Sequence, residues 1–403
     1  MSKKILVGRG FSQYNVLCQA TDEICQGFIN AGYQTEVIDF HLPNAYEQFQ
    51  KCLHNPDNYS FYFSMQALYW DEEKTTTYQL QNIKRIGWIV DDPIYHDERL
   101  SGSTGKNATA LIVRDSHANI IKHDYPHIDH VETLYHGGFI CSDIIPYCKR
   151  KINVFFPGTY TPLADAEQRI DEIDGIYHQV ALAIKPRITG RNLSHSWRDE
   201  LKAYFSSLQV EVSEKEFHAL EYIMSPLDFY QRTFMRTYII ESLLKNNIDV
   251  SVVGSGWDKY NGPGKEHLHI LSHTGIDINE TVRLMGNSKI VLNNTNITDG
   301  LHERILSAML AQSVCVTNGY TLLDNLFQDE QELITFSLDN LETLPNTIKH
   351  LLANPQKCEM IAKRGYQSAL QSHTWDSSWG TNYQLDIQAN SFFILILLLF
   401  PQF

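Results

Sequence analysis

Nowhere in this 403-residue sequence do apolar residues run for the ~20 positions that a membrane-spanning helix needs. The most apolar stretch, Phe392–Phe400, covers nine residues. We expect it to dock on the body of the protein, with a sequence artefact or a weak membrane contact as the alternatives. The opening residues MSKKILVGRG lack the apolar core and cleavage site of a secretory signal. We therefore expect a cytoplasmic protein without a transmembrane segment.

Basic residues are also in short supply. Lys and Arg number 33 against 47 Asp and Glu, and the net charge of −14 argues against general binding to nucleic acid or anionic membranes. The seven cysteines form no CxxC pair and no zinc-ligand spacing, so we expect reduced structural thiols and no metal site. What remains is an ordinary globular composition, 43% hydrophobic and 20% charged, long enough for two or three domains.

The first half alternates short apolar segments with polar ones of helical periodicity. A strand, a helix ending at Gly32 and a second strand form a β–α–β opening, which is typical of a parallel sheet. Further strands follow at similar intervals. We expect strands at Lys4–Val7, Thr35–Phe40, Tyr59–Ser64, Ile86–Val90, Ala110–Arg114 and Val131–Tyr135.

The glycines after the first strand do not complete a dinucleotide-binding motif. Gly8 and Gly10 fit the first two positions of GxGxxG, but Gln13 stands where the third glycine belongs. Asp39, at the end of the next strand, is therefore weak evidence for a ribose contact.

Two loops at strand ends carry residues suited to acid–base chemistry. Asp91 and Asp92 follow a strand, and one of them can act as a general base. The alternative is that one of them caps the turn that Pro93 forces. In Tyr135–Phe139 two glycines permit close approach of a ligand, and His136 can point into the same cleft. The alternative there is a tight turn with a surface histidine.

The second half is another alternation of strands and helices, with a domain boundary near residue 150. Residues 162 to about 246 are mostly helical, and Ser225 and Pro226 mark the start of the clearest helix, which ends near Leu244. The resulting domains are 1–150 and 151–375, followed by a tail at 376–403. We expect strands at Ile152–Pro157, Asp249–Val253, Lys289–Leu292 and Val314–Thr317.

The segment Asn293–Asn318 predicts a strand end, a loop, a short helix and a second buried strand. We expect Asp299 to cap the helix, with Glu303 and Ser307 four apart near its positive end. Such a helix start at the mouth of a parallel sheet holds anions and sugar hydroxyls in many α/β proteins. An ordinary α/β repeat with a surface glutamate is the alternative.

A glycine-containing loop, Gly254-Ser255-Gly256-Trp257, ends the strand at Asp249–Val253. Glycines at a strand end can cradle a phosphate or a nucleotide edge, although alone they are a weak signal. Two α/β domains in one chain leave a cleft, which is the usual place for a ligand.

At this point the sequence resembles a known family, the GT-B glycosyltransferases, and within them the group named for the spore-maturation protein CgeB. Trp88–Pro93 is similar to the WxxDxP-like loop of the family's first domain, and Phe155–Tyr160 to its FxGxY segment. The likeness covers roughly residues 85–160 and 225–375. Four stretches carry it in the family's order: IDVSVVGSGW ending at Trp257, Asn287–Asn294, His302–Thr317 and Leu351–Thr374.

The resemblance implies two Rossmann-like domains, the second holding a nucleotide-sugar donor and the first an acceptor. It implies sugar transfer without an obligatory metal and without a cofactor beyond the donor, since helix N-termini, backbone N–H groups and basic side chains meet the diphosphate charge. In the family's RxFExxxxG helix, Arg304 matches the arginine. Ser307 stands at the glutamate position and Gln312 at the glycine position, and we expect Glu303 to take over the acid's role.

The resemblance also assigns roles to individual residues. Arg304 contacts the diphosphate or, alternatively, forms a salt bridge. Asp91, Asp92 or His136 lies on the acceptor side, where one deprotonates the acceptor hydroxyl if transfer inverts the anomeric centre. The residues expected to contact the donor are Gly254, Gly256, Trp257, Asn294, His302, Glu303, Arg304 and Ser307.

Three functions follow. The first is a glycosyltransferase that acts on a protein or glycan acceptor. The second is a catalytically silent GT-B module that binds nucleotide or glycan and supports a partner enzyme, and Ser307 and Gln312 favour it. The third is a sugar-nucleotide epimerase, which would convert donor with no acceptor present.

Overall fold

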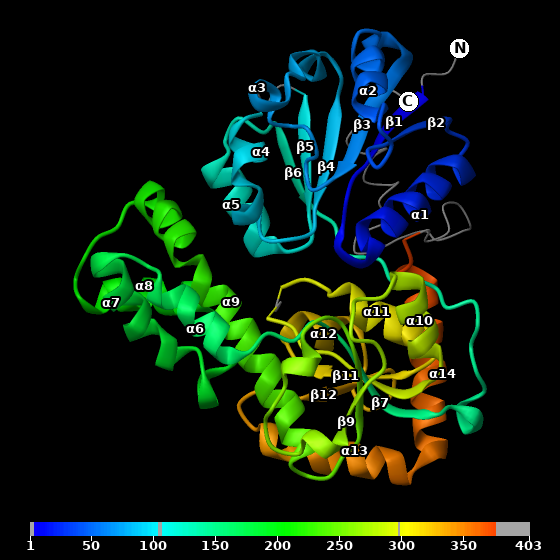
Figure 1. The fold of residues 1–403 in the computed structure, drawn as a ribbon. Coiled ribbons are helices and arrows are strands. Elements are labelled where there is room, and N and C mark those ends of the chain that lie inside the picture. Colours follow the sequence, from blue (N-terminus) through cyan, green and yellow to red (C-terminus); the bar gives the residue numbers. More distant parts are fainter. Residues whose placement is uncertain (1–3, 104–106, 297–298, 376–403) are drawn as a thin grey trace. The chain divides into compact units, whose positions relative to one another are not determined.

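A computed structural model describes residues 4–103, 107–296 and 299–375 of the chain (Figure 1). The tail 376–403, with the expected apolar segment Phe392–Phe400, lies outside the described residues. The chain divides into two compact units. The first contains residues 4–139, 299–306 and 369–375 of the described chain, and the second contains 140–296 and 307–368. No helix of the described ranges is long and apolar enough to cross a membrane.

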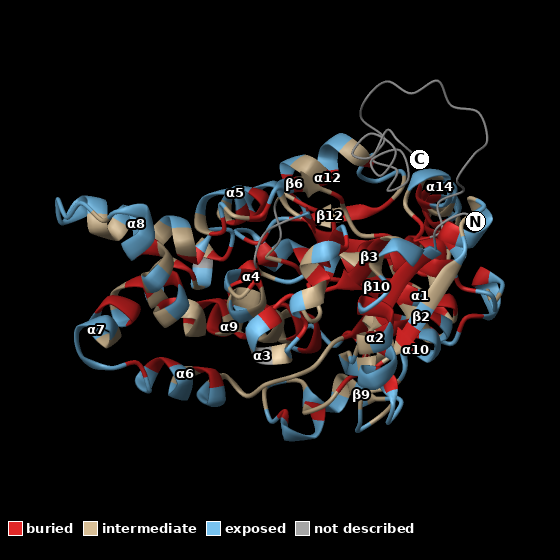
Figure 2. Ribbon diagram, turned by 90° about the horizontal axis from the view of Figure 1, so that it is seen from above, coloured by how far each residue is buried: buried red, intermediate tan, exposed pale blue. Residues whose placement is uncertain are grey.

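The first unit is built on a six-stranded parallel sheet in the order β2-β1-β3-β4-β5-β6. Every residue of β4 and β5 is buried, as expected for a parallel sheet with both faces covered. Figure 2 shows mostly buried residues in the neighbouring strand β3 as well. The strands are β1 Lys4–Arg9, β2 Thr35–Asp39, β3 Tyr59–Met65, β4 Arg85–Ile89, β5 Ala108–Ile112 and β6 His130–Thr133, and the helices are α1 Val16–Asn30, α2 Ala45–Leu53, α3 Glu72–Thr75, α4 Asp97–Ser101 and α5 Asp115–Asp124.

The second unit repeats this design with six parallel strands in the order β12-β11-β10-β7-β8-β9. One core of the unit packs a single face of this sheet against helical residues 235–244, 344–351 and 358–362. The strands are β7 Ile152–Pro157, β8 Val250–Val253, β9 Leu268–Ile270, β10 Ser288–Leu292, β11 Val314–Asn318 and β12 Ile334–Phe336, and the helices are α6 Leu163–Asp171, α7 Gly175–Ile184, α8 Trp197–Ser207, α9 Glu214–Leu244, α10 Ile278–Gly286, α11 Glu303–Leu310, α12 Thr321–Leu326, α13 Leu344–Ala353 and α14 Pro355–Ser372.

All ten expected strands are present within two residues of their predicted bounds, and the α/β class with two parallel sheets is confirmed. Strands β9 and β12 were not predicted from the sequence. Each is a three-residue strand at a sheet edge, too short to show a period of its own.

Helices α6 to α9 form the predicted helical region between β7 and β8, with a core of their own. The predicted start of its last helix at Ser225 is wrong. Helix α9 begins at Glu214, where Ser213 and Glu216 form a capping box, and it continues through Pro226 to Leu244. Burial of Phe217 and Met224 on the preceding turns extends the helix, at the cost of the hydrogen bond that proline cannot donate.

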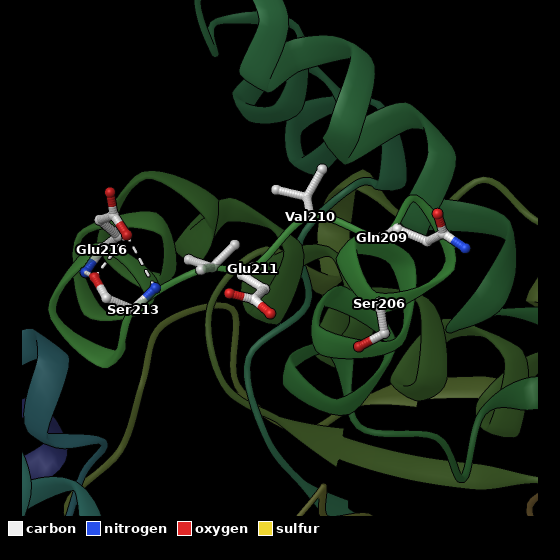
Figure 3. Close-up of a pocket in the computed structure, with 7 residues that line it drawn as sticks. Ser206, Gln209, Val210, Glu211, Ser213 and Glu216 are labelled. Atoms are coloured by element: carbon white, nitrogen blue, oxygen red, sulfur yellow. Dashed lines mark hydrogen bonds between the residues drawn. The ribbon is translucent and has the colours of Figure 1, made fainter.

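The same capping box borders an open pocket between α8 and α9. Figure 3 shows Ser213 and Glu216 joined by hydrogen bonds, with Ser213 N donating to Glu216 Oε2 at 2.9 Å. The pocket is lined mostly by polar side chains, and Val210 at its rim is half exposed. Two of its polar residues, Ser213 and Glu216, form the capping box of α9, and none of the predicted site residues lines it, so it is not the candidate site.

Candidate functional site

The two loops that follow β7 and β8 pack closely against each other. Gly254 and Gly256 adopt φ values of +121° and +88°. A Cβ at Gly254 would lie 2.6 Å from the carbonyl oxygen of Gly158, and one at Gly256 would lie 2.2 Å from that of Tyr160. Glycine is therefore required at both positions by the chain's own backbone, whether or not a ligand approaches.

Trp257 packs against the same pair of loops. Its side chain is 1% exposed, its indole N–H donates to the carbonyl of Gly158 at 2.6 Å, and its ring stacks on Tyr160 with centroids 5.0 Å apart. The indole thus belongs to the core of the unit. A ligand above these loops would meet backbone groups, because the Trp257 ring is covered.

Next to these loops, the ends of β10 and β11 are tied together by buried asparagines and threonines. Asn293 Nδ2 donates to Thr317 Oγ1 at 2.9 Å. Asn318 receives the Thr295 N–H at 2.9 Å and donates to the Thr295 carbonyl at 3.0 Å. This ladder fixes the backbone that follows β10 in the middle of the sheet's carboxyl edge.

Asn294, within the ladder, has a buried oxygen with no partner among the described residues. The residue is 6% exposed, and its Oδ1 makes no hydrogen bond. Leaving a buried acceptor unpaired costs roughly 1–3 kcal/mol. A ligand that donates a hydroxyl or an N–H here recovers that energy, so the position favours binding of a polyhydroxylated or nucleoside ligand.

Asn296 continues from the ladder toward the helical region. Its Nδ2 donates to Asp228 Oδ1 on α9 at 2.9 Å, and the other Asp228 oxygen pairs with Arg232 at 2.8 Å. Asp228 is only 6% exposed. The loop after β10 is therefore braced by α9, and only knowledge of the fold could have indicated this contact.

The expected role of Asp299 as the cap of the next helix is wrong. Its carboxylate instead receives Arg114 Nε at 2.8 Å and the Ser116 N–H at 2.6 Å, at the start of α5 in the first unit. Burial raises the pKa of Asp299, but Arg114 and Ser116 outweigh it and hold that pKa below its usual value. Sequence spacing can suggest only a cap that is close in the chain, whereas Arg114 and Ser116 lie more than 180 residues away from Asp299.

Helix α11 begins at Glu303, directly after His302, whose Nδ1 accepts the Arg304 N–H at 3.1 Å. Glu303 and Arg304 are half-buried in its first turn, whereas Ser307 is fully buried. The predicted shared face of Glu303 and Ser307 therefore holds in spacing, but only Glu303 is partly open to solvent.

Of the acceptor-side candidates, Asp91 and Asp92 differ sharply. The Asp91 side chain is 63% exposed. The Asp92 side chain is 11% exposed, accepts the Ile94 N–H at 3.2 Å and lies 3.5 Å from His117 Nε2. Asp92 therefore caps the turn at Pro93, which is the structural alternative in the sequence analysis, and Asp91 is the exposed carboxylate of the pair.

Asp91 is held by a residue that the sequence analysis did not single out. Gln66 Nε2 donates to Asp91 Oδ2 at 2.5 Å. His96 Nε2 lies 3.9 Å from the same oxygen. Burial, followed by the charge of Arg99, lowers the pKa of His96 to about 4, so its imidazole is neutral near pH 7. No spacing rule connects Gln66 with Asp91, since they follow different strands.

His136 lies in an aromatic cluster of the first unit. Its ring is edge-on to Trp375 at 5.9 Å, and its buried Nδ1 has no hydrogen-bond partner in the described chain. Burial lowers the pKa of His136 to about 4. The neighbouring Gly137 is required because a Cβ there would lie 2.6 Å from the Trp375 backbone nitrogen. This imidazole is a weak base, packed where the chain returns to the first unit.

The candidate residues divide between the two units. The second contains Gly254, Gly256, Trp257, Asn294 and Ser307, and the first contains Asp91, Asp92, His136, His302, Glu303 and Arg304. Gly254, Gly256 and Asn294 lie in loops at the carboxyl ends of parallel strands of the second unit, and Asp91 and Asp92 lie in such a loop of the first, where α/β proteins bind ligands.

Comparison with known proteins finds one family model that matches part of the chain and solved structures with a similar fold. Residues 232–381 match the family described as glycosyl transferase-like. No curated protein matches the sequence. Among similar solved structures, an alpha-glucosyltransferase in complex with UDP and a 13-mer DNA containing a HMU base has a TM-score of 0.57 at 12% identity, over 92% of this chain and 94% of that chain.

Two further structures give the same picture. The alpha-glucosyltransferase in complex with UDP-glucose and DNA containing an abasic site has a TM-score of 0.52 at 12% identity, over 92% of this chain and 95% of that chain. Anabaena Alr3699/HepE in complex with UDP and glucose has a TM-score of 0.51 at 11% identity, over 93% and 96%. With its two parallel six-stranded sheets the chain has the fold of the GT-B glycosyltransferase structures, and residues 232–381 are similar to the glycosyl transferase-like family.

Proposed function

We propose that this chain is a cytoplasmic glycosyltransferase of the CgeB-like group, which moves a sugar from a nucleotide-sugar donor to a hydroxyl of a protein or glycan acceptor. The second unit holds the donor and the first holds the acceptor, and the reaction requires no metal and no cofactor besides the donor. The observation that carries the proposal is Asn294, a buried and unpaired acceptor at the carboxyl edge of the sheet, inside the segment that matches the family.

The geometry of the second unit supports a donor site at the carboxyl ends of β7, β8 and β10. Backbone groups of the loops at Gly254 and Gly256 face the nucleotide, and Asn294 Oδ1 accepts a hydroxyl of the ribose or sugar. From the resemblance alone, His302 and Glu303 are further donor contacts, and Arg304 meets the diphosphate charge. The similar structures contain UDP or UDP-glucose, which makes a uridine nucleotide the first donor to test.

On the acceptor side, Asp91 is the proposed general base for an inverting transfer. Its carboxylate takes the proton of the acceptor hydroxyl while that oxygen bonds to the anomeric carbon. The bond from that carbon to the diphosphate oxygen breaks, and the nucleoside diphosphate leaves with the electron pair. Of the two neighbouring carboxylates only Asp91 is exposed, because Asp92 is committed to the turn.

Replacing Asn294 tests the donor site directly. Asn294→Ala should raise the donor KM about three- to tenfold, since one neutral hydrogen bond to the ligand is lost, and should leave acceptor KM unchanged. Asn153→Ala is the matched control, because Asn153 is an exposed asparagine near the start of β7 in the same unit. Equal donor KM values in the two variants would remove Asn294 from the site.

The silent module remains a second candidate, because the family's glutamate position is filled by Ser307, whose side chain is fully buried. Glu303→Ala separates the two. In an active enzyme the loss of Glu303 should abolish transfer of labelled sugar with the fold intact. A chain that binds nucleoside diphosphate but transfers no sugar, with or without Glu303, is the silent module.

A further inference from the structure

Gln66, the residue that follows β3, is fully engaged by its surroundings. Its N–H donates to the Trp88 carbonyl at 2.8 Å, and its own carbonyl accepts Arg99 Nη1 at 2.8 Å. Its side-chain Oε1 accepts the Val90 N–H at 3.1 Å, and its Nε2 donates to Asp91. Gln66 is only 6% exposed, and its backbone N–H, backbone carbonyl, side-chain oxygen and side-chain nitrogen each form a hydrogen bond.

The backbone at this position is unusual as well. Gln66 adopts φ +56°, and Ala67 and Tyr69 also have positive φ values. Left-handed geometry costs a non-glycine residue roughly 1–2 kcal/mol, and such residues cluster at functional sites. Glycine would adopt this backbone without strain but would lack the amide that spans from the end of β4 to the Asp91 carboxylate.

The amide fixes the orientation of an otherwise exposed group. Oε1 accepts the N–H of Val90, the residue directly after β4. This bond sets the direction of Nε2, and with it the position of Asp91 Oδ2. The charged or titratable groups near it include Asp92, His117 beside Asp92, the neutral His96, and Arg99, whose Nη1 donates to the Gln66 carbonyl. Gln66 is thus the hydrogen-bond donor that the structure aims at this carboxylate.

We infer that Gln66 is a positioning residue for Asp91, which holds the carboxylate in its charged form and in line with the acceptor hydroxyl. The inference rests on the proposed function and adds a residue to it. Because the hydrogen bond favours the carboxylate over the carboxylic acid, its loss shifts the titration of Asp91 to higher pH. Loss of this hydrogen bond also leaves the carboxylate less precisely positioned, and a displacement of about 1 Å can lower the rate up to about a hundredfold.

Two variants of the full-length chain separate the contributions. Gln66→Met removes both side-chain hydrogen bonds at nearly constant length. Gln66→Glu keeps an acceptor for the Val90 N–H but places an oxygen beside Asp91. Gln50→Met is the matched control, because the Gln50 amide donates to Tyr46 Oη and the Thr76 carbonyl in the same unit, 2.7 and 3.1 Å away.

In Gln66→Met we expect kcat/KM for the acceptor to fall about ten- to a hundredfold, with donor KM unchanged. The acid limb of its pH profile should move to higher pH, and further in Gln66→Glu. Gln50→Met should match wild type in all three. If Gln66→Met lost no more activity than Gln50→Met and kept the wild-type acid limb, a purely structural role would remain and the inference would be overturned.

A second measurement does not need turnover. The carboxyl carbon of Asp91, assigned by its absence in Asp91→Asn, is titrated by NMR, and its midpoint should move to higher pH in Gln66→Met. An unchanged midpoint overturns the inference whatever the activity. Full turnover in Asp91→Asn overturns both the base and its positioning residue. An inactive Asp91→Asn beside a fully active Gln66→Met overturns only the role of Gln66.

Discussion

At the scale of one residue, Gly256 shows that a glycine attributed to ligand binding can be required first by the packing of the chain itself. The sequence analysis selected Gly254 and Gly256 as a ligand cradle, and the structure shows that the opposing loop at Gly158–Tyr160 demands them first. Only the backbone of a distant segment could reveal this. In the same way Asp299 looked like a local cap, and its true partners follow β5 in the first unit.

Gly256→Ala should destabilise the second unit by about 2 kcal/mol or more, because the strained φ is joined by a clash with the Tyr160 carbonyl. Gly175→Ala is the control, since Gly175 also has a positive φ of +57° but open space around it. It should cost only about 1 kcal/mol. Denaturant unfolding measures both, and equal losses would contradict the clash.

At the scale of elements, ten strands and the end of α9 were predictable to within two residues, whereas the starts of α9 and α11 were not. Helix α11 was expected, but its start depends on contacts rather than on Asp299. Helix α9 passes through Pro226 because its buried face continues on both sides. The short edge strands β9 and β12 exist because neighbouring strands pair with them, which no local pattern records.

The end of α11 explains the unusual residue at the family's glycine position. Gln312 adopts φ +52°. Its N–H donates to the Met309 carbonyl at 2.9 Å, and the Ser313 N–H donates to the Ala308 carbonyl at 3.1 Å, which is a Schellman motif. Gln312 thus occupies the left-handed position that glycine usually fills, and its backbone is strained as a result.

Gln312→Gly should therefore stabilise the chain by about 0.5–1 kcal/mol, since relief of left-handed strain exceeds the entropy that glycine adds to the unfolded state. The Gln312 carbonyl, which accepts Arg150 Nη1 at 2.7 Å, is kept in the variant. Urea unfolding gives the difference. A loss of stability would show that the Gln312 side chain contributes more than its backbone costs.

At the scale of the whole molecule, the two-sheet α/β plan was predictable because it rests on periodicity and order, which the sequence carries. The candidate site was predictable only in part. Strand ends indicated where Asp91 and Asn294 would lie, but the partners that distinguish them, Gln66 and the unpaired oxygen of Asn294, depend on packing between segments far apart in sequence.

Stability should fall as the pH drops from about 6.5 toward 4. Burial lowers the pKa of three histidines of the first unit, His96, His136 and His373, to about 4. The unfolded chain, whose histidines keep pKa values near 6.5, takes up protons first as the pH falls, and each buried histidine adds at most about 1.4 kcal/mol per pH unit to the loss.

His136→Gln should flatten this dependence when the melting temperature is followed between pH 6.5 and 4.5. His130→Gln, at an exposed position of the same unit, is the control and should keep the wild-type slope. Identical slopes in the two variants would mean that His136 does not stay neutral in the folded chain.

The central claim is that the second unit binds a nucleotide-sugar donor. The most direct measurement is the melting temperature of the full-length chain with UDP, GDP, ADP and their sugars. A ligand that binds only the folded state adds about 2.7 kcal/mol of stability at a hundredfold excess over Kd. We predict a clear rise with one nucleotide series, reduced in Asn294→Ala. No rise with any of them would contradict the account.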